Sequence, residues 1–354
     1  MSTIQLLPGI TQKKVKTDRL EVAYLEAGTG SIPIVLVHGN LSSSLFFQDL
    51  MQDLSANGRY KIFAIDMRGY GESEVLAVDA TRGVQDYSDD LDAFARALYL
   101  NSYHLLGWSL GGNVVLQYAI DYPDTLRSLI LEATSSPFGF GGTKDARGTL
   151  TWPDFAGSGG GIVNTDFVRL LAEGDRGDSQ FSPRTIMNTF YFKPPFKTAP
   201  DYEEMYLTSL LMTRVTPGNY PGDFISSNNW PNVAPGTKGA INGLSPKYLN
   251  QSNFASISHK MPVLWIHGAD DQVASDTSLF DFGFLGQIGA VPGWPGTEVY
   301  PPQPMKTQVR TVLERYKANG GEYQEVQLAD CGHSPHIEKR EEVLQLFTNF
   351  VDAH

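Results

Sequence analysis

Short, unbroken runs of apolar residues recur along the chain and predict the strands of a buried sheet. The clearest runs are Ile34–Val37, Ile62–Ile65, His104–Leu106, Leu129–Leu131 and Val263–Ile266. Runs of this kind are typical of strands buried on both faces, as in a parallel sheet covered by helices. Two earlier segments, Val15–Thr17 and Leu20–Glu26, alternate apolar and polar residues instead. We expect these two to form an antiparallel hairpin.

Helical patterns separate the apolar runs. In Tyr87–Leu98 the apolar residues fall on one stripe, and a similar stripe follows Glu338 in the last helix. Strands that alternate with helices predict a doubly wound α/β fold with a mostly parallel sheet. Such sheets carry their chemistry at the carboxyl ends of the strands, so the residues that follow each apolar run are the candidates for function.

The alternation stops near Ser135 and resumes at Pro262. We therefore predict a core domain of residues 1–135 and 260–354, with an inserted, mainly helical cap or lid of residues 136–259, called the insert below. Its expected helices are Asp166–Glu173 capped by Thr165 and closed by Gly174, one that opens at Ser182-Pro183, and Asp201–Met212. Two loops rich in Gly and Pro, residues 217–243 and 283–304, exceed the usual length. We interpret them as lid or subunit-contact candidates, which leaves a homodimer open.

Composition narrows the function classes. The net charge of -12 disfavours a nucleic acid ligand, because a polyanion would be repelled. Cys331 is the single cysteine, so no intramolecular disulfide can form. No apolar run approaches the ~20 residues that span a bilayer, and residues 1–30 lack the pattern of a secretory signal. We expect a cytoplasmic protein without a membrane span.

One motif carries nucleophilic chemistry. Gly107-Trp108-Ser109-Leu110-Gly111 follows a predicted strand and opens a predicted helix, Leu110–Ile120. This is the context of a nucleophile elbow, in which a strained turn exposes the serine above the sheet. Glycines are needed around the serine, Gly112 included, because side chains there would collide with the neighbouring strand and helix. We identify Ser109 as the candidate nucleophile.

The chain resembles the α/β-hydrolase superfamily, in its branch of capped serine esterases and lactonases. Besides the elbow, the motifs that carry the resemblance are His38-Gly39-Asn40, Asp66-Met67-Arg68-Gly69-Tyr70-Gly71-Glu72-Ser73, and Cys331-Gly332-His333-Ser334-Pro335. The similarity covers roughly residues 15–135 and 260–352. It implies hydrolysis that needs neither a metal nor an organic cofactor.

A serine hydroxyl needs a base, and the base needs a carboxylate that holds its tautomer. His333 follows the predicted last strand, Gln324–Leu328, and is the candidate base, with His336 as its rival. Asp271 fits the family's G-x-x-D-x-x-V turn and is the candidate acid. Glu132 is the serious alternative acid, and Asp270 is a weaker one.

The resemblance also implies the remaining parts of the site. The backbone N–H groups of Asn40 and Leu110 are the expected donors of the oxyanion hole. The Asn40 side chain either adds a polar contact or caps its loop. In the Asp66–Ser73 motif, Asp66 and Arg68 are expected to brace loops rather than to act in catalysis. We interpret Cys331 as a buried small side chain.

These features predict a serine hydrolase that cleaves a carboxylic ester or lactone through an acyl-enzyme. The insert is dense in aromatic residues, which favours a hydrophobic, uncharged substrate, although such residues more often build a cap's own core. A serine nucleophile argues against an epoxide hydrolase or a haloalkane dehalogenase. The alternatives left open are an amidase or peptidase, a C–C bond hydrolase, a perhydrolase and a non-catalytic small-molecule receptor.

Overall fold

The computed structural model describes residues 6–354, so the first five residues of the predicted core domain lie outside the described residues. An eight-stranded sheet runs through the molecule in the order β1-β2-β4-β3-β5-β6-β9-β10. The strands of the chain are β1 (Ile10–Lys16), β2 (Glu21–Ala27), β3 (Ile32–Val37), β4 (Tyr60–Ile65), β5 (Tyr103–Trp108), β6 (Leu126–Glu132), β7 (Phe224–Ser226), β8 (Val233–Pro235), β9 (Val263–Gly268) and β10 (Tyr323–Leu328).

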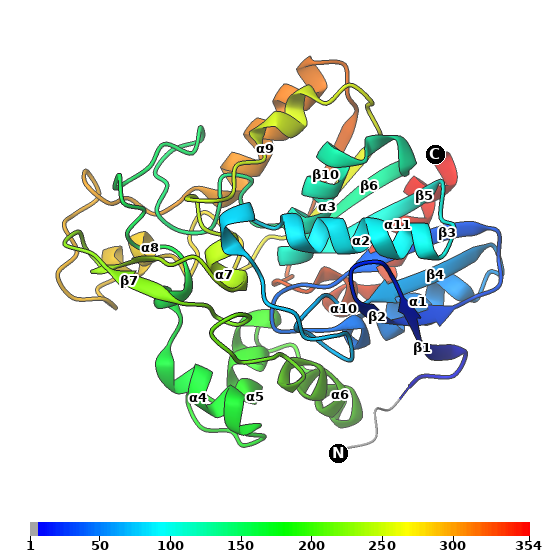
Figure 1. The fold of residues 1–354 in the computed structure, drawn as a ribbon, viewed down its shortest axis with the longest axis horizontal. Helices are drawn as coiled ribbons and strands as arrows, with labels where there is room; N and C mark the ends of the chain where they lie inside the picture. The colour runs from blue at the N-terminus through cyan, green and yellow to red at the C-terminus, as the bar shows by residue number, and fades with distance from the viewer. Residues whose placement is uncertain (1–5) are drawn as a thin grey trace.

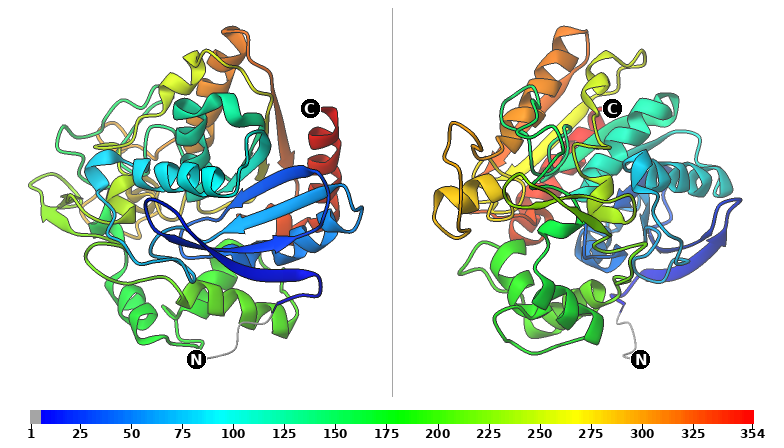
Figure 2. Two further views of the ribbon diagram at one scale, coloured as in Figure 1. Left: turned by 45° about the vertical axis from the view of Figure 1, so that its right-hand side comes forward. Right: turned by 60° about the vertical axis from the view of Figure 1, so that its left-hand side comes forward.

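Only the start of the sheet is antiparallel. Strand β1 pairs with β2, and β2 pairs with β4, in antiparallel register. The pairs from β4 through β3, β5, β6 and β9 to β10 are all parallel. The predicted hairpin, parallel sheet and α/β fold class are therefore confirmed, and Figure 2 shows the β1–β2 hairpin at one edge of the sheet.

Helices cover both faces of the sheet (Figure 1). The helices are α1 (Gln48–Ser55), α2 (Gln85–Ala97), α3 (Leu110–Asp121), α4 (Thr165–Glu173), α5 (Pro183–Ile186), α6 (Pro200–Leu211), α7 (Ala240–Gly243), α8 (Phe282–Gln287), α9 (Met305–Ala318), α10 (Pro335–Glu338) and α11 (Arg340–Ala353). Helix α9 was not predicted, although Val309, Val312, Leu313 and Tyr316 are spaced as one buried helical stripe.

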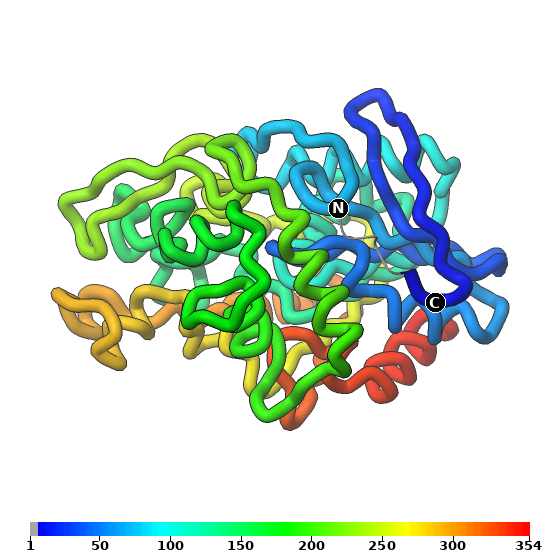
Figure 3. The backbone as a smooth tube through the Cα atoms, turned by 90° about the horizontal axis from the view of Figure 1, so that it is seen from below, coloured from blue at the N-terminus to red at the C-terminus, as the bar shows by residue number. Residues whose placement is uncertain are grey.

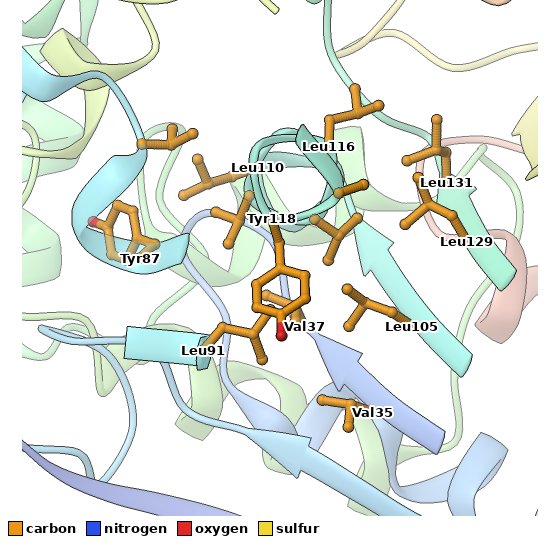
Figure 4. Close-up of a cluster of buried hydrophobic side chains, with 14 of the residues drawn as sticks. Val35, Val37, Tyr87, Leu91, Leu105, Leu110, Leu116, Tyr118, Leu129 and Leu131 are labelled. Atoms are coloured by element: carbon orange, nitrogen blue, oxygen red, sulfur yellow. The ribbon is translucent and has the colours of Figure 1, made fainter. Parts of the chain in front are cut away.

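The unbroken apolar runs are explained by burial on two sides. In β3, Val35 and Val37 join the core cluster that also contains residues of α2, α3 and α9. Ile34 and Leu36 of the same strand join the opposite cluster, with residues of α1 and α11. Figure 4 shows the first cluster, with side chains of α3 standing over those of β3, β5 and β6. Every position in such a strand is apolar because neither face meets water.

The insert begins after β6 and ends before β9. Gly174 ends α4 in the left-handed conformation, and the Ser182 hydroxyl accepts a hydrogen bond from the Thr185 N–H at the start of α5, as predicted. The predicted cap of α4 was wrong, because the side chain of Asn164, not that of Thr165, accepts a hydrogen bond from the Phe167 N–H. Thr165 is the first residue of the helix. The residue before it, Asn164, is therefore in the position to accept a hydrogen bond from an N–H group of the first turn.

The two long loops are partly ordered by local structure. Residues 217–243 contain an antiparallel pair, β7–β8, which forms a second, two-stranded sheet that was not predicted. Residues 283–304 include most of α8. The two loops meet where the Trp230 indole N–H donates to the Pro292 carbonyl. Their roles as lid or subunit contact, and the division of the chain into core and cap domains, stay predictions.

The insert lies at the carboxyl end of the parallel strands, and Figure 3 shows its green segment, with α4 to α6, nearest the viewer. From the short helical turn η5 (Met187–Tyr191), the Tyr191 hydroxyl donates to the carbonyls of Asn40 and Leu41, which follow β3. No helix among residues 6–354 is long and apolar enough to cross a bilayer.

Candidate active site

Ser109 stands at the junction of β5 and α3 in a strained conformation. Its backbone has φ 57° and ψ -121°, outside the regions that residues with side chains favour. Its N–H donates to the Glu132 carbonyl at the end of β6 (2.9 Å). The strain is characteristic of a functional turn, and it presents the hydroxyl above the carboxyl edge of the sheet.

Glycines permit the close packing of this turn. A Cβ on Gly107 would overlap the Gly111 carbonyl, and one on Gly111 would overlap the Val37 carbonyl at the end of β3. A Cβ on Gly112 would overlap the Thr134 side chain after β6. The predicted collisions with the neighbouring strand and helix are therefore confirmed.

His333 reaches Ser109 from the loop after β10. Its Nε2 lies 2.9 Å from Ser109 Oγ, within hydrogen-bond range, although the two residues are 224 positions apart. The Trp108 indole N–H donates to the His333 carbonyl (2.7 Å), which ties the loop to the elbow. The imidazole is buried, so its position is fixed by the protein rather than by solvent.

Asp271 lies on the other side of the same imidazole. Its Oδ2 is 3.0 Å from His333 Nδ1, while its Oδ1 accepts from the backbone N–H groups of Val273 and Ala274. Burial favours the neutral acid, but the facing His333, the Lys306 ammonium and the Val273 N–H outweigh it, and the pKa of Asp271 is lowered. The carboxylate is held in its charged form.

The two rival residues pair with each other instead. Glu132 Oε1 lies 3.0 Å from His336 Nδ1 and also accepts from the His336 backbone N–H. Both side chains are fully buried. Asp270, the third candidate acid, faces Lys193 at 2.9 Å and is 43% exposed. Neither Glu132 nor Asp270 occupies the place beside His333 that Asp271 holds.

The loop after β3 passes close to the serine. A Cβ on Gly39 would come within 2.9 Å of Ser109 Cβ, so only glycine allows this approach. The next residue, Asn40, accepts from the Tyr70 hydroxyl through its side chain (2.8 Å) and from the Tyr191 hydroxyl through its carbonyl (2.9 Å). With both acceptors engaged by tyrosines, the orientation of the Asn40 peptide is set from core and insert together.

His38 forms hydrogen bonds that hold this loop in place. Its Nδ1 lies 2.7 Å from the Gly39 carbonyl, and its Nε2 accepts from the Met67 N–H. Burial lowers the pKa of His38 to about 4, so the ring is neutral at neutral pH.

The Asp66–Ser73 motif has the bracing contacts that were predicted for it. Asp66 accepts from the N–H groups of Ser44 and Glu72, which joins the loops after β3 and β4. Arg68 makes two hydrogen bonds to the carboxylate of Asp90 in α2, at 2.6 and 2.7 Å. Cys331 is also as expected, a buried side chain.

Some aromatic residues of the insert pack on one another. Phe192 lies against Phe196 and Tyr206, and Tyr206 lies against Tyr202. Others pack on rings outside the insert, as Phe190 does on Phe280. Tyr191 is the one that reaches the candidate base, since its ring is 6.3 Å from that of His333. Sequence reasoning missed this contact and the role of Trp108, because each joins segments far apart in the chain. No cluster of His, Cys, Asp and Glu suited to a metal ion occurs within residues 6–354.

Comparison with known proteins agrees with the fold described above. Residues 32–158 match the family described as the alpha/beta hydrolase fold. A 2-(acetamidomethylene)succinate hydrolase of Mesorhizobium japonicum is 32% identical over 118 residues, which are 33% of this chain and 41% of that protein. A pimeloyl-[acyl-carrier protein] methyl ester esterase of Aeromonas salmonicida is 37% identical over 106 residues, 30% of this chain and 39% of that protein. The matched region thus spans about two fifths of these relatives.

The similarity to solved structures extends over nearly the whole chain. The esterase EaEST of Exiguobacterium antarcticum superposes with a TM-score of 0.62 at 15% identity, over 97% of this chain and 100% of that one. At this identity the likeness concerns the fold. The sheet order, the family match over residues 32–158 and the likeness to solved structures together identify the fold of this chain as the α/β-hydrolase fold.

Proposed function

We propose that the protein is a serine hydrolase that cleaves a carboxylic ester or lactone with a triad of Ser109, His333 and Asp271. The observation that carries the proposal is the unbroken chain of contacts from Ser109 Oγ to His333 Nε2 (2.9 Å) and from His333 Nδ1 to Asp271 Oδ2 (3.0 Å). With the Asp271 carboxylate accepting from Nδ1–H, Nε2 is free to accept the serine proton.

The reaction has two halves. Ser109 Oγ attacks the ester carbonyl while His333 takes the hydroxyl proton, and the imidazolium then gives that proton to the departing alcohol. Water, deprotonated by His333, attacks the acyl-enzyme and releases the acid. For a lactone the alcohol stays attached to the acyl group, so a hydroxy acid leaves in the second half.

The backbone N–H groups of Leu110 and Asn40 stabilise the oxyanion in this proposal. Leu110 is the first residue of α3, where a helix leaves its N–H groups without intrahelical acceptors. The approach of Gly39 to Ser109 brings the second donor, Asn40, to the same edge. Loss of one such donor typically costs about 3 kcal/mol of transition-state stabilisation.

The substrate we propose is hydrophobic and uncharged. Support comes from the aromatic rings that flank the triad, Trp108 at 5.8 Å and Tyr191 at 6.3 Å from the His333 ring centroid. Ester chemistry is supported by the names of the methyl ester esterase and of the esterase with the same fold.

The test is turnover of a panel of p-nitrophenyl esters with short, long and aromatic acyl groups, beside a set of lactones. We expect the wild type to hydrolyse members of the panel and Ser109→Ala to lose that activity while keeping its circular dichroism spectrum. If the protein hydrolysed amides or C–C bonds but not esters or lactones, the proposed reaction would be wrong. Absence of turnover over the whole panel would favour the receptor hypothesis.

A further inference from the structure

One half-buried carboxylate lies between the insert and the loop that carries His333. Glu338, at the end of α10, accepts from the Gly332 N–H (3.0 Å) and from the Ser334 N–H (3.2 Å). These are the residues directly before and after His333. Its other oxygen accepts from the backbone N–H of Lys193 in the insert (2.7 Å). A charged acceptor makes each of these bonds stronger than one between neutral groups.

The same insert residue contacts both catalytic loops through its side chain. Lys193 Nζ lies 2.9 Å from Asp270, the neighbour of Asp271, and 2.7 Å from Asp330 in the loop that leads to His333. The carboxylate of Asp330 is 80% exposed, so each ion pair alone contributes little. Together the two ion pairs connect Lys193 of the insert to the loop that carries Asp271 and to the loop that carries His333.

Gly332 makes this close contact sterically feasible. A Cβ at this position would lie 2.7 Å from the Lys193 nitrogen and 3.0 Å from Glu338 Oε1. The backbone of Gly332 does not have a positive φ, so its glycine is explained by the approach of the insert rather than by a turn. Gly332, the residue before His333, is therefore in close contact with the insert as well as being next to the candidate base.

We propose that Glu338 is a positioning residue that couples docking of the insert at Lys193 to the placement of His333. The proposal rests on the proposed role of His333 as the base. In this proposal Glu338 acts through His333, because its hydrogen bonds go to backbone N–H groups. It holds the amide groups on both sides of His333, and Lys193 holds the segment that lies over them. Loosening this junction misplaces the imidazole relative to Ser109, and a shift of about 1 Å can cost about 10²-fold in rate.

The experiment combines ester turnover with amide hydrogen exchange on Glu338→Gln and Glu338→Ala, with Glu342→Ala as a matched control. Glu342 is exposed on α11, the next helix. For Glu338→Ala we expect kcat to fall about 10²-fold with KM changed less than threefold. Glu338→Gln keeps an acceptor oxygen and is expected to lose less. In both variants, peptides covering 190–197 and 328–338 should exchange faster together.

Lys193→Met, compared with Lys197→Met, tests the second contact. Lys197 is exposed and lies four residues further along the insert. We expect a loss of up to fivefold in kcat for Lys193→Met only, and this difference should shrink in 0.5 M salt, which screens partly exposed pairs.

The outcomes separate this proposal from the proposed function. Faster exchange in both segments of a folded Glu338 variant supports the coupling even if the panel of esters is not turned over. Unchanged kcat per folded molecule in Glu338→Ala, or faster exchange in one segment alone, overturns it.

Discussion

Two buried histidine–carboxylate pairs have their histidines three residues apart, His333 in the loop after β10 and His336 in α10. His333 Nδ1 faces Asp271 at 3.0 Å, and His336 Nδ1 faces Glu132 at the same distance. Both pairs are almost completely shielded from solvent. They differ at the opposite nitrogen: His333 Nε2 meets Ser109 Oγ, whereas His336 Nε2 has no hydrogen-bond partner within residues 6–354.

A buried histidine that faces a carboxylate is therefore not by itself a catalytic base, because it also needs contact with the nucleophile. The His336 ring lies between Phe47 and Trp108, 5.1 and 5.2 Å from their ring centroids. Glu132 also accepts the His336 N–H and thereby fixes the start of α10. We infer that this pair is structural, and that contact with the elbow serine is what distinguishes the catalytic pair.

The largest expected effect comes from breaking the catalytic pair's contact with the serine. Ser109→Ala and His333→Ala should each lower kcat by about 10⁴- to 10⁶-fold, since a nucleophile and its base act as one unit. For the same reason the double variant should be no slower than either single variant. Initial rates with the best p-nitrophenyl ester measure this, and multiplied losses in the double variant would contradict it.

The next comparison exchanges the two acids. Asp271→Asn should lower kcat by about 10⁴-fold, because the amide no longer holds the required imidazole tautomer. Glu132→Gln should leave kcat within about tenfold of the wild type, since an amide oxygen can still accept from the His336 N–H. A larger loss from Glu132→Gln than from Asp271→Asn would reverse the assignment of the two pairs.

Stability should reveal the structural pair. Removing one partner in Glu132→Met or His336→Phe should lower the free energy of unfolding by about 3–5 kcal/mol, because the other buried group loses its partner. The double variant should recover much of that loss. Urea unfolding of the four proteins measures the coupling, and additive losses would mean that the two side chains do not act as a pair.

A smaller effect, on the pH dependence of stability, is expected for the buried histidines that do not face a carboxylate. Burial lowers the pKa of both His38 and His104 to about 4, from the ordinary histidine value of 6.5. Between these values the unfolded chain binds more protons, so stability is complete above pH 6.5 and falls as the pH is lowered toward 4, by about 3 kcal/mol per histidine. His104→Gln should reduce the slope of unfolding free energy against pH in this window, and an unchanged slope would contradict the prediction.

Much of the fold was predictable because local patterns determine it. The apolar runs of β3 and β5 reflect burial on both faces, and the glycines around Ser109 reflect contacts within one β-α turn. The helix α9 was missed although its apolar stripe was present. Its prediction required only attention to the spacing of Val309, Val312 and Leu313.

The parts of the site that escaped prediction are contacts between distant segments. Glu338 meets Lys193 across 145 positions, and Glu132 meets His336 across 204. Nothing in either local sequence specifies its partner, because tertiary packing alone brings them together. Glu132 and His336 were each recognised as chemically able residues, but only the fold assigns them to each other.

The most direct test of the central claim is the site and rate of phosphonylation by a fluorophosphonate, followed by intact mass and peptide mapping. We expect a single adduct on Ser109, formed at least 10³-fold more slowly in His333→Ala and within tenfold of the wild-type rate in the Glu132→Met, His336→Phe double variant. An adduct on another residue, or a wild-type rate in His333→Ala, would contradict it.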